Sequence, residues 1–176
     1  YEKAVGWDGR IHSEGRRISL ALGEPAVRLA DVRDTVRRHL ADGWMPAVIV
    51  EAQVGQVAVK QTSFVAFTDA KKNSGPALFV RVELTNLGEQ PFIGPLAVEV
   101  RDAPPDPFEG SLGVEIFNPP RDNTSSRWEL KNNMLFRNCR PFLAAGRKCR
   151  AGDDPADMVF DVNLQPGKTT IFDLVC

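Results

Sequence analysis

Apolar and polar residues alternate along two stretches of the chain, residues 76–101 and 157–175. In the first stretch, Arg81 and Glu83 stand between apolar neighbours, and the second stretch alternates in the same way. A period of two is typical of a strand with one face in a core and the other in water. Turn residues interrupt each stretch, so we predict that each folds as a hairpin. The expected strands are 77–86, 96–101, 158–164 and 169–175, with turns at 86–91 and 165–168.

The same pattern predicts further strands elsewhere in the chain. Two of them meet around Gly55, and the second of these offers Val57, Val59, Phe64 and Phe67 as core candidates. These further strands are expected at residues 18–22, 47–52, 56–67, 112–117 and 127–130.

One stretch departs from the strand pattern and predicts a short helix over residues 29–40. Four of its apolar residues fall at helical spacing, and Gly43 would end the helix. The β-branched residues of this stretch would also suit a strand. The apolar positions concerned are Leu29, Val32, Val36 and Leu40.

At least seven short strands with at most one helix predict an all-β fold, a two-sheet antiparallel β-sandwich. We expect a single domain over residues 1–176. It would carry a proline-rich loop excursion at 103–133 and a charged loop at 137–157. Parallel α/β folds are disfavoured, because they need a helix between successive strands.

Charge and length narrow the classes of partner. The chain has 22 Lys and Arg against 23 Asp and Glu, a net charge of −1. This balance argues against nucleic acid or an anionic membrane as the main partner. Its apolar runs are far shorter than the roughly 20 residues of a membrane span. The chain begins at Tyr1 with neither an initiator Met nor an apolar signal core, which indicates a processing boundary, and the compartment stays open.

Neither a metal centre nor a catalytic constellation is recognisable in the sequence. The two histidines, His12 and His39, have no Cys or His at ligand spacing. An acidic loop at 153–157 could hold Ca²⁺, but a solvated loop is the favoured interpretation. No nucleophile elbow and no glycine-rich phosphate loop are present. We therefore expect no catalytic residue, no metal and no cofactor in this chain.

Three tryptophans are candidates for carbohydrate binding. Sugars stack their apolar faces on exposed aromatic rings, and Trp7, Trp44 and Trp128 stand in turn-like or loop-like sequence. Trp128 is the first choice for an exposed ring, because its surroundings are polar. The alternative is that the rings are largely buried, as most Trp side chains are.

A basic cluster surrounds two of the three cysteines, Cys139 and Cys149. Such a cluster could bind an acidic glycan or the acidic face of a partner. Alternatively, the acidic loop at 153–157 neutralises it. The two cysteines could form a local disulfide worth about 2–3 kcal/mol, or all three could be reduced thiols. The basic residues are Arg137, Arg140, Arg147, Lys148 and Arg150.

Four short motifs carry a family resemblance. Residues 42–46 read Asp-Gly-Trp-Met-Pro, and residues 61–64 read Gln-Thr-Ser-Phe. Residues 86–88 contain Asn-Leu-Gly, and residues 164–167 read Leu-Gln-Pro-Gly. The series resembles the amino-terminal super-sandwich domain of bacterial glycoside hydrolases and phosphorylases whose catalytic part is an (α/α)6 helical barrel. The resemblance covers roughly residues 40–101 and 157–175.

The resemblance implies a non-catalytic role. In that family the sandwich packs against the barrel and helps to shape its cleft, while the catalytic carboxylates lie in the barrel. No catalytic residue is therefore carried over to this chain. We expect a structural or substrate-proximal domain of a carbohydrate-active enzyme, with a helical-barrel domain of the same parent protein and a carbohydrate ligand as partners. The alternatives are an independent lectin-like module or a structural, assembly-forming sandwich.

Overall fold

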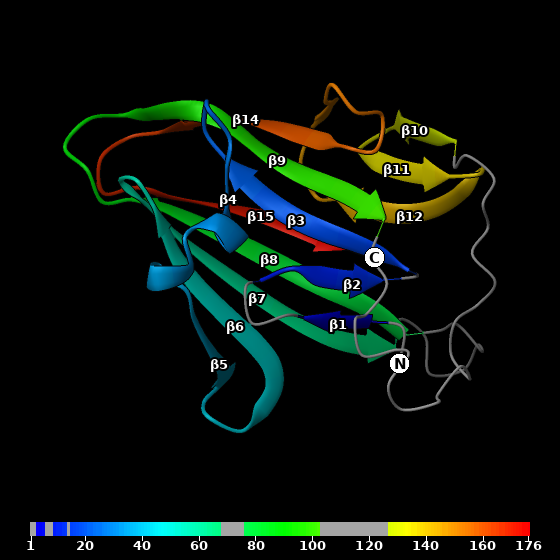
Figure 1. Cartoon of the computed structure of the whole chain (residues 1–176), viewed down its shortest axis with the longest axis horizontal. Coiled ribbons are helices and arrows are strands. Elements are labelled where there is room, and N and C mark those ends of the chain that lie inside the picture. The colour runs from blue at the N-terminus through cyan, green and yellow to red at the C-terminus, as the bar shows by residue number, and fades with distance from the viewer. Residues whose placement is uncertain (1–2, 6–8, 14, 68–75, 103–126) are drawn as a thin grey trace.

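The computed structural model of the chain describes residues 3–5, 9–13, 15–67, 76–102 and 127–176. Two antiparallel β-sheets pack on one another around a shared apolar core (Figure 1). The predicted two-sheet β-sandwich is confirmed.

The first sheet has seven strands. In spatial order it contains β1 (Lys3–Val5), β2 (Ile11–Ser13), β3 (Arg16–Leu22), β9 (Phe92–Asp102), β14 (Met158–Leu164) and β13 (Arg150–Ala151), and β4 (Val27–Arg28) also pairs with β3.

The second sheet has eight strands. In spatial order these are β10 (Trp128–Lys131), β11 (Met134–Arg137), β12 (Arg140–Ala145), β15 (Thr169–Val175), β8 (Pro76–Asn86), β7 (Val57–Phe67), β6 (Met45–Val54) and β5 (Arg37–Ala41).

The core lies between the two sheets and follows the alternation of the sequence. On β8, every second residue from Leu78 onward points inward and is buried, while Arg81 and Glu83 point outward. Phe160 from the seven-stranded sheet meets Phe172 from the other sheet, with ring centroids 5.1 Å apart. The largest fully buried apolar side chains are Ile11, Ile18, Leu22, Leu78, Leu84, Leu96, Leu135, Leu143, Met158 and Phe160.

The two predicted hairpins are wrong, although their strands and turns are in place. β8 and β9 lie in different sheets, and so do β14 and β15. Instead β8 pairs with β15, with Val82 opposite Phe172, and β9 pairs with β14, with Val98 opposite Met158. Each turn is thus an arch that carries the chain between sheets, and the two arches lie side by side at one end of the sandwich (Figure 1). Alternation shows which residues face the core, but it does not show which strand is the neighbour.

The predicted helix at residues 29–40 is also wrong. Two single turns of 3-10 helix, η1 (Leu29–Asp31) and η2 (Arg33–Thr35), lead into the edge strand β5. The Thr35 hydroxyl accepts a hydrogen bond from the Gln53 backbone N–H at 3.2 Å, which joins this segment to β6. Pairing with β6, together with the β-branched residues, overrides the helical spacing.

The two expected loop regions are partly structured. Residues 103–126 of the proline-rich excursion, with the strand predicted at 112–117, lie outside the described residues. From Trp128 the chain is strand β10, and the expected charged loop at 137–157 contains β12 and β13. The hairpin predicted around Gly55 is confirmed, with φ of +56° at that residue.

Candidate functional site

The outer face of the eight-stranded sheet carries a continuous row of apolar side chains. Strand register places one from each of six neighbouring strands in line, and none of them is fully buried. The Phe64 side chain is 43% exposed, and its ring stacks on Phe79 with centroids 5.2 Å apart. Neighbouring strands lie about 4.8 Å apart, so the row extends about 24 Å. This apolar row consists of Ala47, Phe64, Phe79, Val175, Ala144 and Met134.

Charged residues border the apolar row on one side. The Arg81 guanidinium forms a two-point contact with the Asp173 carboxylate, at 2.8 and 3.3 Å. The hydrogen bond that Arg81 donates to Asp173 raises the pKa of Arg81. One row further, the Lys60 ammonium lies 4.0 Å from Glu83. A solvated sheet face usually carries polar side chains, whereas an apolar centre with a charged rim is typical of a protein interface.

Sequence reasoning missed this row because it assigned Phe64 to the core. Val57 and Val59 are buried as predicted, but Phe64 lies an odd number of residues away and therefore faces outward. Phe67 has the inward parity of Val57, yet it is 71% exposed at the end of β7. Strict counting of strand parity along β7 would have identified Phe64 as an outward residue.

The Asn86 side chain holds the two arches together. Its amide donates to the Leu164 carbonyl at 2.9 Å and to the Gln90 carbonyl at 2.8 Å, and its oxygen accepts from the Gly88 N–H at 2.9 Å. Its backbone bonds to residues 167 and 168 of the other arch. Asn86 is fully buried. These residues belong to the Asn-Leu-Gly and Leu-Gln-Pro-Gly motifs, so both motifs serve the architecture.

The other two motifs are divided between core and surface. Gln61 and Ser63 are buried between the sheets, with the Gln61 amide nitrogen 3.2 Å from the Ser63 hydroxyl. Phe64, from the same motif, is part of the apolar row. Residues 42–46 form the tip of the β5–β6 hairpin, where Asp42 and Gly43 both have positive φ.

Of the three candidate tryptophans, Trp44 is exposed and Trp128 is not. Trp128, expected to be the exposed ring, is half-buried and meets Phe142 edge to face at a centroid distance of 5.2 Å. Alternation on the short strand β10 directs it against the core. Trp44 is the exposed one, at 75%, at the hairpin tip before β6. Trp7 lies outside the described residues.

The predicted basic residues lie at both ends of β12. Arg137 and Arg140 face each other across the tip of the β11–β12 hairpin. The other three, Arg147, Lys148 and Arg150, follow the opposite end of the strand. Of the acidic loop residues expected to neutralise this cluster, Asp153, Asp154 and Asp157, the last two contact Arg101 instead.

The predicted disulfide is not formed, since Cys139 and Cys149 are both free thiols, as is Cys176. Cys139 is in the exposed tight turn before β12, with φ of +63°. Cys149 lies beyond the other end of that strand, where its N–H donates to the Asn133 side chain at 3.1 Å. Strand β12 separates them by roughly 15 Å, well beyond the Cα separation that a disulfide spans.

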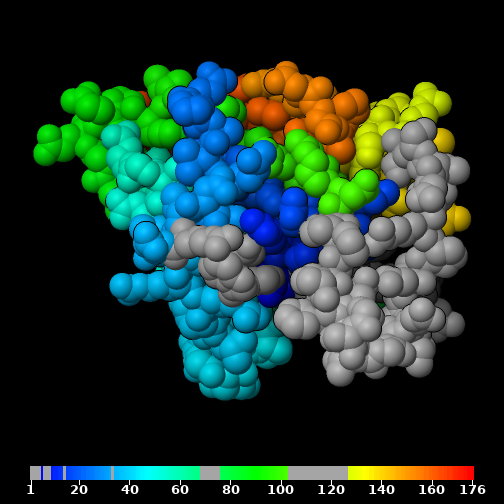
Figure 2. All heavy atoms as spheres, viewed as in Figure 1, coloured from blue at the N-terminus to red at the C-terminus, as the bar shows by residue number. Residues whose placement is uncertain are grey.

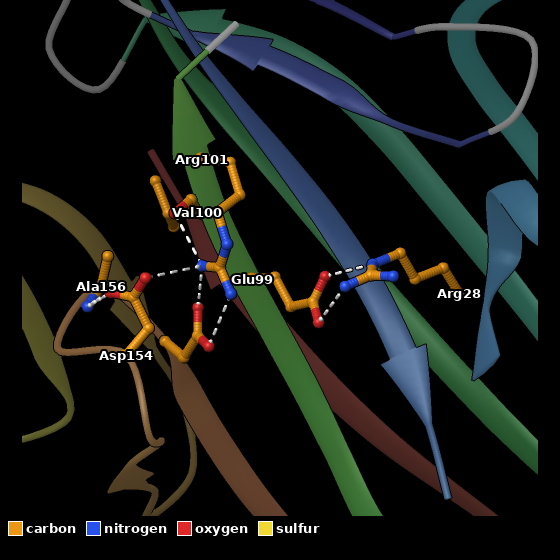
Figure 3. Close-up of polar contacts among 7 residues, drawn as sticks. Arg28, Glu99, Val100, Arg101, Asp154 and Ala156 are labelled. Atoms are coloured by element: carbon orange, nitrogen blue, oxygen red, sulfur yellow. Dashed lines mark hydrogen bonds and ion pairs between the residues drawn. The ribbon is translucent and has the colours of Figure 1, made fainter. Parts of the chain in front are cut away.

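The outer face of the seven-stranded sheet carries ion pairs between arginines and carboxylates (Figure 3). Arg28 contacts Glu99 through two hydrogen bonds, at 2.6 and 3.1 Å, and Arg101 contacts Asp157 in the same two-point manner. Glu99 and Asp157 are both buried. Hydrogen bonding by these carboxylates raises the pKa of Arg28 and of Arg101. An Asp154 carboxylate oxygen also lies 3.6 Å from the Arg101 guanidinium. The positive charges of Arg28 and Arg101 are therefore balanced by carboxylates of the same domain.

Within the described residues there is neither a group of side chains that could hold a metal ion nor a helix that could span a membrane. No three His, Cys, Asp or Glu side chains among them are grouped as a metal site. The Asp154 carboxylate, considered for Ca²⁺, accepts the Ala156 N–H at 2.9 Å and faces Arg101. Within the same residues, no helix has the length and apolar character needed to cross a bilayer.

The sequence matches no protein-family model, and the search of curated proteins finds no significantly similar sequence. Inferences about function therefore depend on the faces of the sandwich described above.

Proposed function

We propose that this chain is a non-catalytic β-sandwich module of a carbohydrate-active enzyme, and that its apolar row docks on a helical catalytic domain of the same parent protein. The chemistry would then lie in that other domain, and this chain would have a structural or substrate-proximal role.

The observation that carries the proposal is the apolar row with its charged border. Helices packed side by side lie 8–10 Å apart, so a row about 24 Å long could contact two or three neighbouring helices of a barrel wall. The flat aromatic pair Phe64 and Phe79 would be the central anchor, since aromatic residues dominate interface energetics. On the opposite outer face, Arg28 pairs with Glu99 and Arg101 pairs with Asp157.

The family resemblance supports the choice of partner. Its motifs occur at the Asn86 arches, at the start of β6 and in the middle of β7, on or next to the strands that carry the apolar row. The first check is the coding sequence beside this segment, where an in-frame helical-barrel domain is expected.

The functional test uses that longer protein with Phe64→Asp and Phe79→Asp together. We expect limited proteolysis to release an intact 19.4 kDa module readily from the double variant and only slowly from the wild type. The control is Gln53→Asp with Thr85→Asp, on the same face in the row beyond the charged border. Equal release from wild type and both variants would contradict the docking. Glycosidase or phosphorylase turnover by the isolated chain, abolished by a point substitution within it, would contradict the non-catalytic role.

A second candidate is an independent carbohydrate-binding sandwich, favoured by the exposure of Trp44. Its ring, 75% exposed at the hairpin tip, is available for stacking on a sugar. In this case Trp44→Ala should abolish binding on a glycan array, while Trp128→Phe should leave it unchanged. Binding that is the same in Trp44→Ala and wild type would exclude this platform.

A further inference from the structure

Basic residues concentrate at one edge of the sandwich. Residues 127–151 contain seven Lys and Arg against a single acidic residue, Glu129, although the whole chain is balanced. Strands β10, β11 and β12 form one edge of the eight-stranded sheet, and β13 is an edge strand of the other sheet. In Figure 2 this yellow and orange surface lies at the upper right, far from the cyan β5–β6 hairpin at the bottom. The basic edge consists of Arg127, Lys131, Arg137, Arg140, Arg147, Lys148 and Arg150.

Three of the acidic residues that follow the basic edge in sequence form ion pairs with arginines outside it. Asp154 and Asp157 contact Arg101, and Asp173 contacts Arg81. Asp161 reaches Arg150 at 3.4 Å, but both side chains are more than half exposed, so water and salt screen this pair. No ion pair of the described residues involves Arg140 or Lys148.

The guanidinium of Arg147 is held in place without a carboxylate. Its terminal nitrogen donates to the Thr170 hydroxyl at 2.7 Å, and the group lies 5.1 Å from the centre of the Phe172 ring. These neutral contacts order the side chain, and no carboxylate of the described residues pairs with its charge. Burial also raises the pKa of the neighbouring Cys149 thiol, which keeps that group neutral. A fixed arginine fork of this kind suits a planar carboxylate or a sulfate ester.

The side chains around the basic residues indicate the class of ligand. None of the large exposed apolar side chains of the described residues lies between 127 and 151. Protein partners need apolar or aromatic anchors, and single-stranded nucleic acids need exposed rings for base stacking. The net charge of −1 further disfavours a polyanion as dense as nucleic acid. A hydrated chain of lower charge density fits this surface better.

The two halves of the basic edge set a minimum length for the ligand. Arg137 and Arg140 are at one end of β12, and Arg147 and Lys148 follow the other end. At about 3.3 Å per residue, the strand separates them by roughly 15–20 Å. Only a polymer that reaches both ends gains from simultaneous contacts.

We propose that the basic edge binds an acidic polysaccharide whose carboxylates are spaced along the chain. The basic edge shares no residue with the apolar row, although Met134 and Ala144 of the row lie on its strands β11 and β12. The proposal is the same whether the module is part of an enzyme or independent. The probe is polygalacturonate, titrated calorimetrically into the protein at about 0.1 M NaCl. Its methyl ester, which lacks the charge, and monomeric galacturonate serve as ligand controls.

The test variant is Arg140→Glu with Lys148→Glu, and the matched control is Arg37→Glu with Arg38→Glu. All four side chains are exposed, and the control changes the charge equally at the opposite edge of the sheet. We expect roughly tenfold weaker binding by the test variant, wild-type binding by the control, and no binding of either ligand control. Binding should also weaken as NaCl rises to about 0.5 M.

Three results would overturn the proposal. Unchanged affinity in the test variant would show that the basic edge is not the binding site. An equal loss of affinity in both variants would show that binding depends only on the net charge of the protein. Tighter binding of duplex DNA than of polygalacturonate at the same salt concentration would show that the ligand class is wrong. If the test variant does not fold, as judged by circular dichroism, Arg140→Gln with Lys148→Gln replaces it and is expected to weaken binding in the same direction.

Discussion

The Asn86 arches and the apolar row differ in how many of their side-chain contacts are made within the domain. Asn86 is fully buried, and all its polar side-chain atoms have partners inside the fold. The rings of Phe64 and Phe79 contact each other but are left partly open to solvent. The arches carry recognisable motifs, and the apolar row carries none apart from Phe64.

This difference separates folding from function. Residues whose contacts close within the chain stabilise the sandwich, so their motifs report the architecture. Residues whose contacts stay open add little to folding and are available to a partner. The motifs that carry the family resemblance are therefore weaker evidence for function than the surface formed by the strands they position.

The largest effect on stability is expected for Asn86→Ala, which removes the side chain that holds the two arches together. It removes three side-chain hydrogen bonds and leaves the buried Leu164 carbonyl without one of its donors, so we expect a loss of about 3 kcal/mol in the free energy of unfolding. Urea unfolding measures it. The control is Asn163→Ala, at an exposed asparagine of β14. This substitution should lower the free energy of unfolding by less than about 0.5 kcal/mol. Similar losses for both variants would show that the arches do not depend on Asn86.

A smaller effect is expected when a buried ion pair is broken. Asp157→Ala removes the two-point contact with Arg101 and should cost about 2 kcal/mol, because Asp157 is buried and its loss leaves Arg101 without this partner. Asp173→Ala breaks a pair of the same geometry with Arg81, but those side chains are 53% and 55% exposed. Thermal unfolding should therefore show a clearly smaller shift for Asp173→Ala, and the reverse order would contradict this distinction between buried and exposed pairs.

The smallest effect on stability is expected in the apolar row itself. Phe79→Thr keeps strand propensity on an open face, so the free energy of unfolding of the isolated chain should fall by no more than about 1 kcal/mol. Leu84→Thr, on the inward face of the same strand, should cost about 3 kcal/mol. A loss at Phe79 as large as that at Leu84 would mean that the row is needed for folding, and it would weaken the functional assignment.

The sequence predicts the strands of this protein better than their neighbours. The period of two placed β7, β8, β14 and β15 almost to the residue, since burial on one face imposes that pattern. The same pattern could not distinguish a hairpin from an arch, because both bury the same side chains. The hydrogen bond from the Asn86 side chain to the Leu164 carbonyl joins the two arches. These residues are far apart in the sequence, so the contact is visible only in the folded structure.

The candidate sites were predicted less well, for a related reason. Phe64 and Phe79 are 15 residues apart in the sequence and become neighbours only through the register of β7 with β8. Trp44 and Trp128 both stand in polar sequence, and only packing against Phe142 separates the half-buried ring from the exposed one. The concentration of basic residues was visible in the sequence. The partners of the nearby carboxylates, Arg101 above all, were not.

The most direct measurement of the central claim is hydroxyl-radical footprinting of the apolar row in the isolated chain and in the longer protein that we propose contains it. The account predicts that oxidation of Phe64 is strongly suppressed in the longer protein. Ile93, 75% exposed on the seven-stranded sheet, should be oxidised equally in both. Equal oxidation of Phe64 in the two proteins would contradict the claim that this face docks on a catalytic domain.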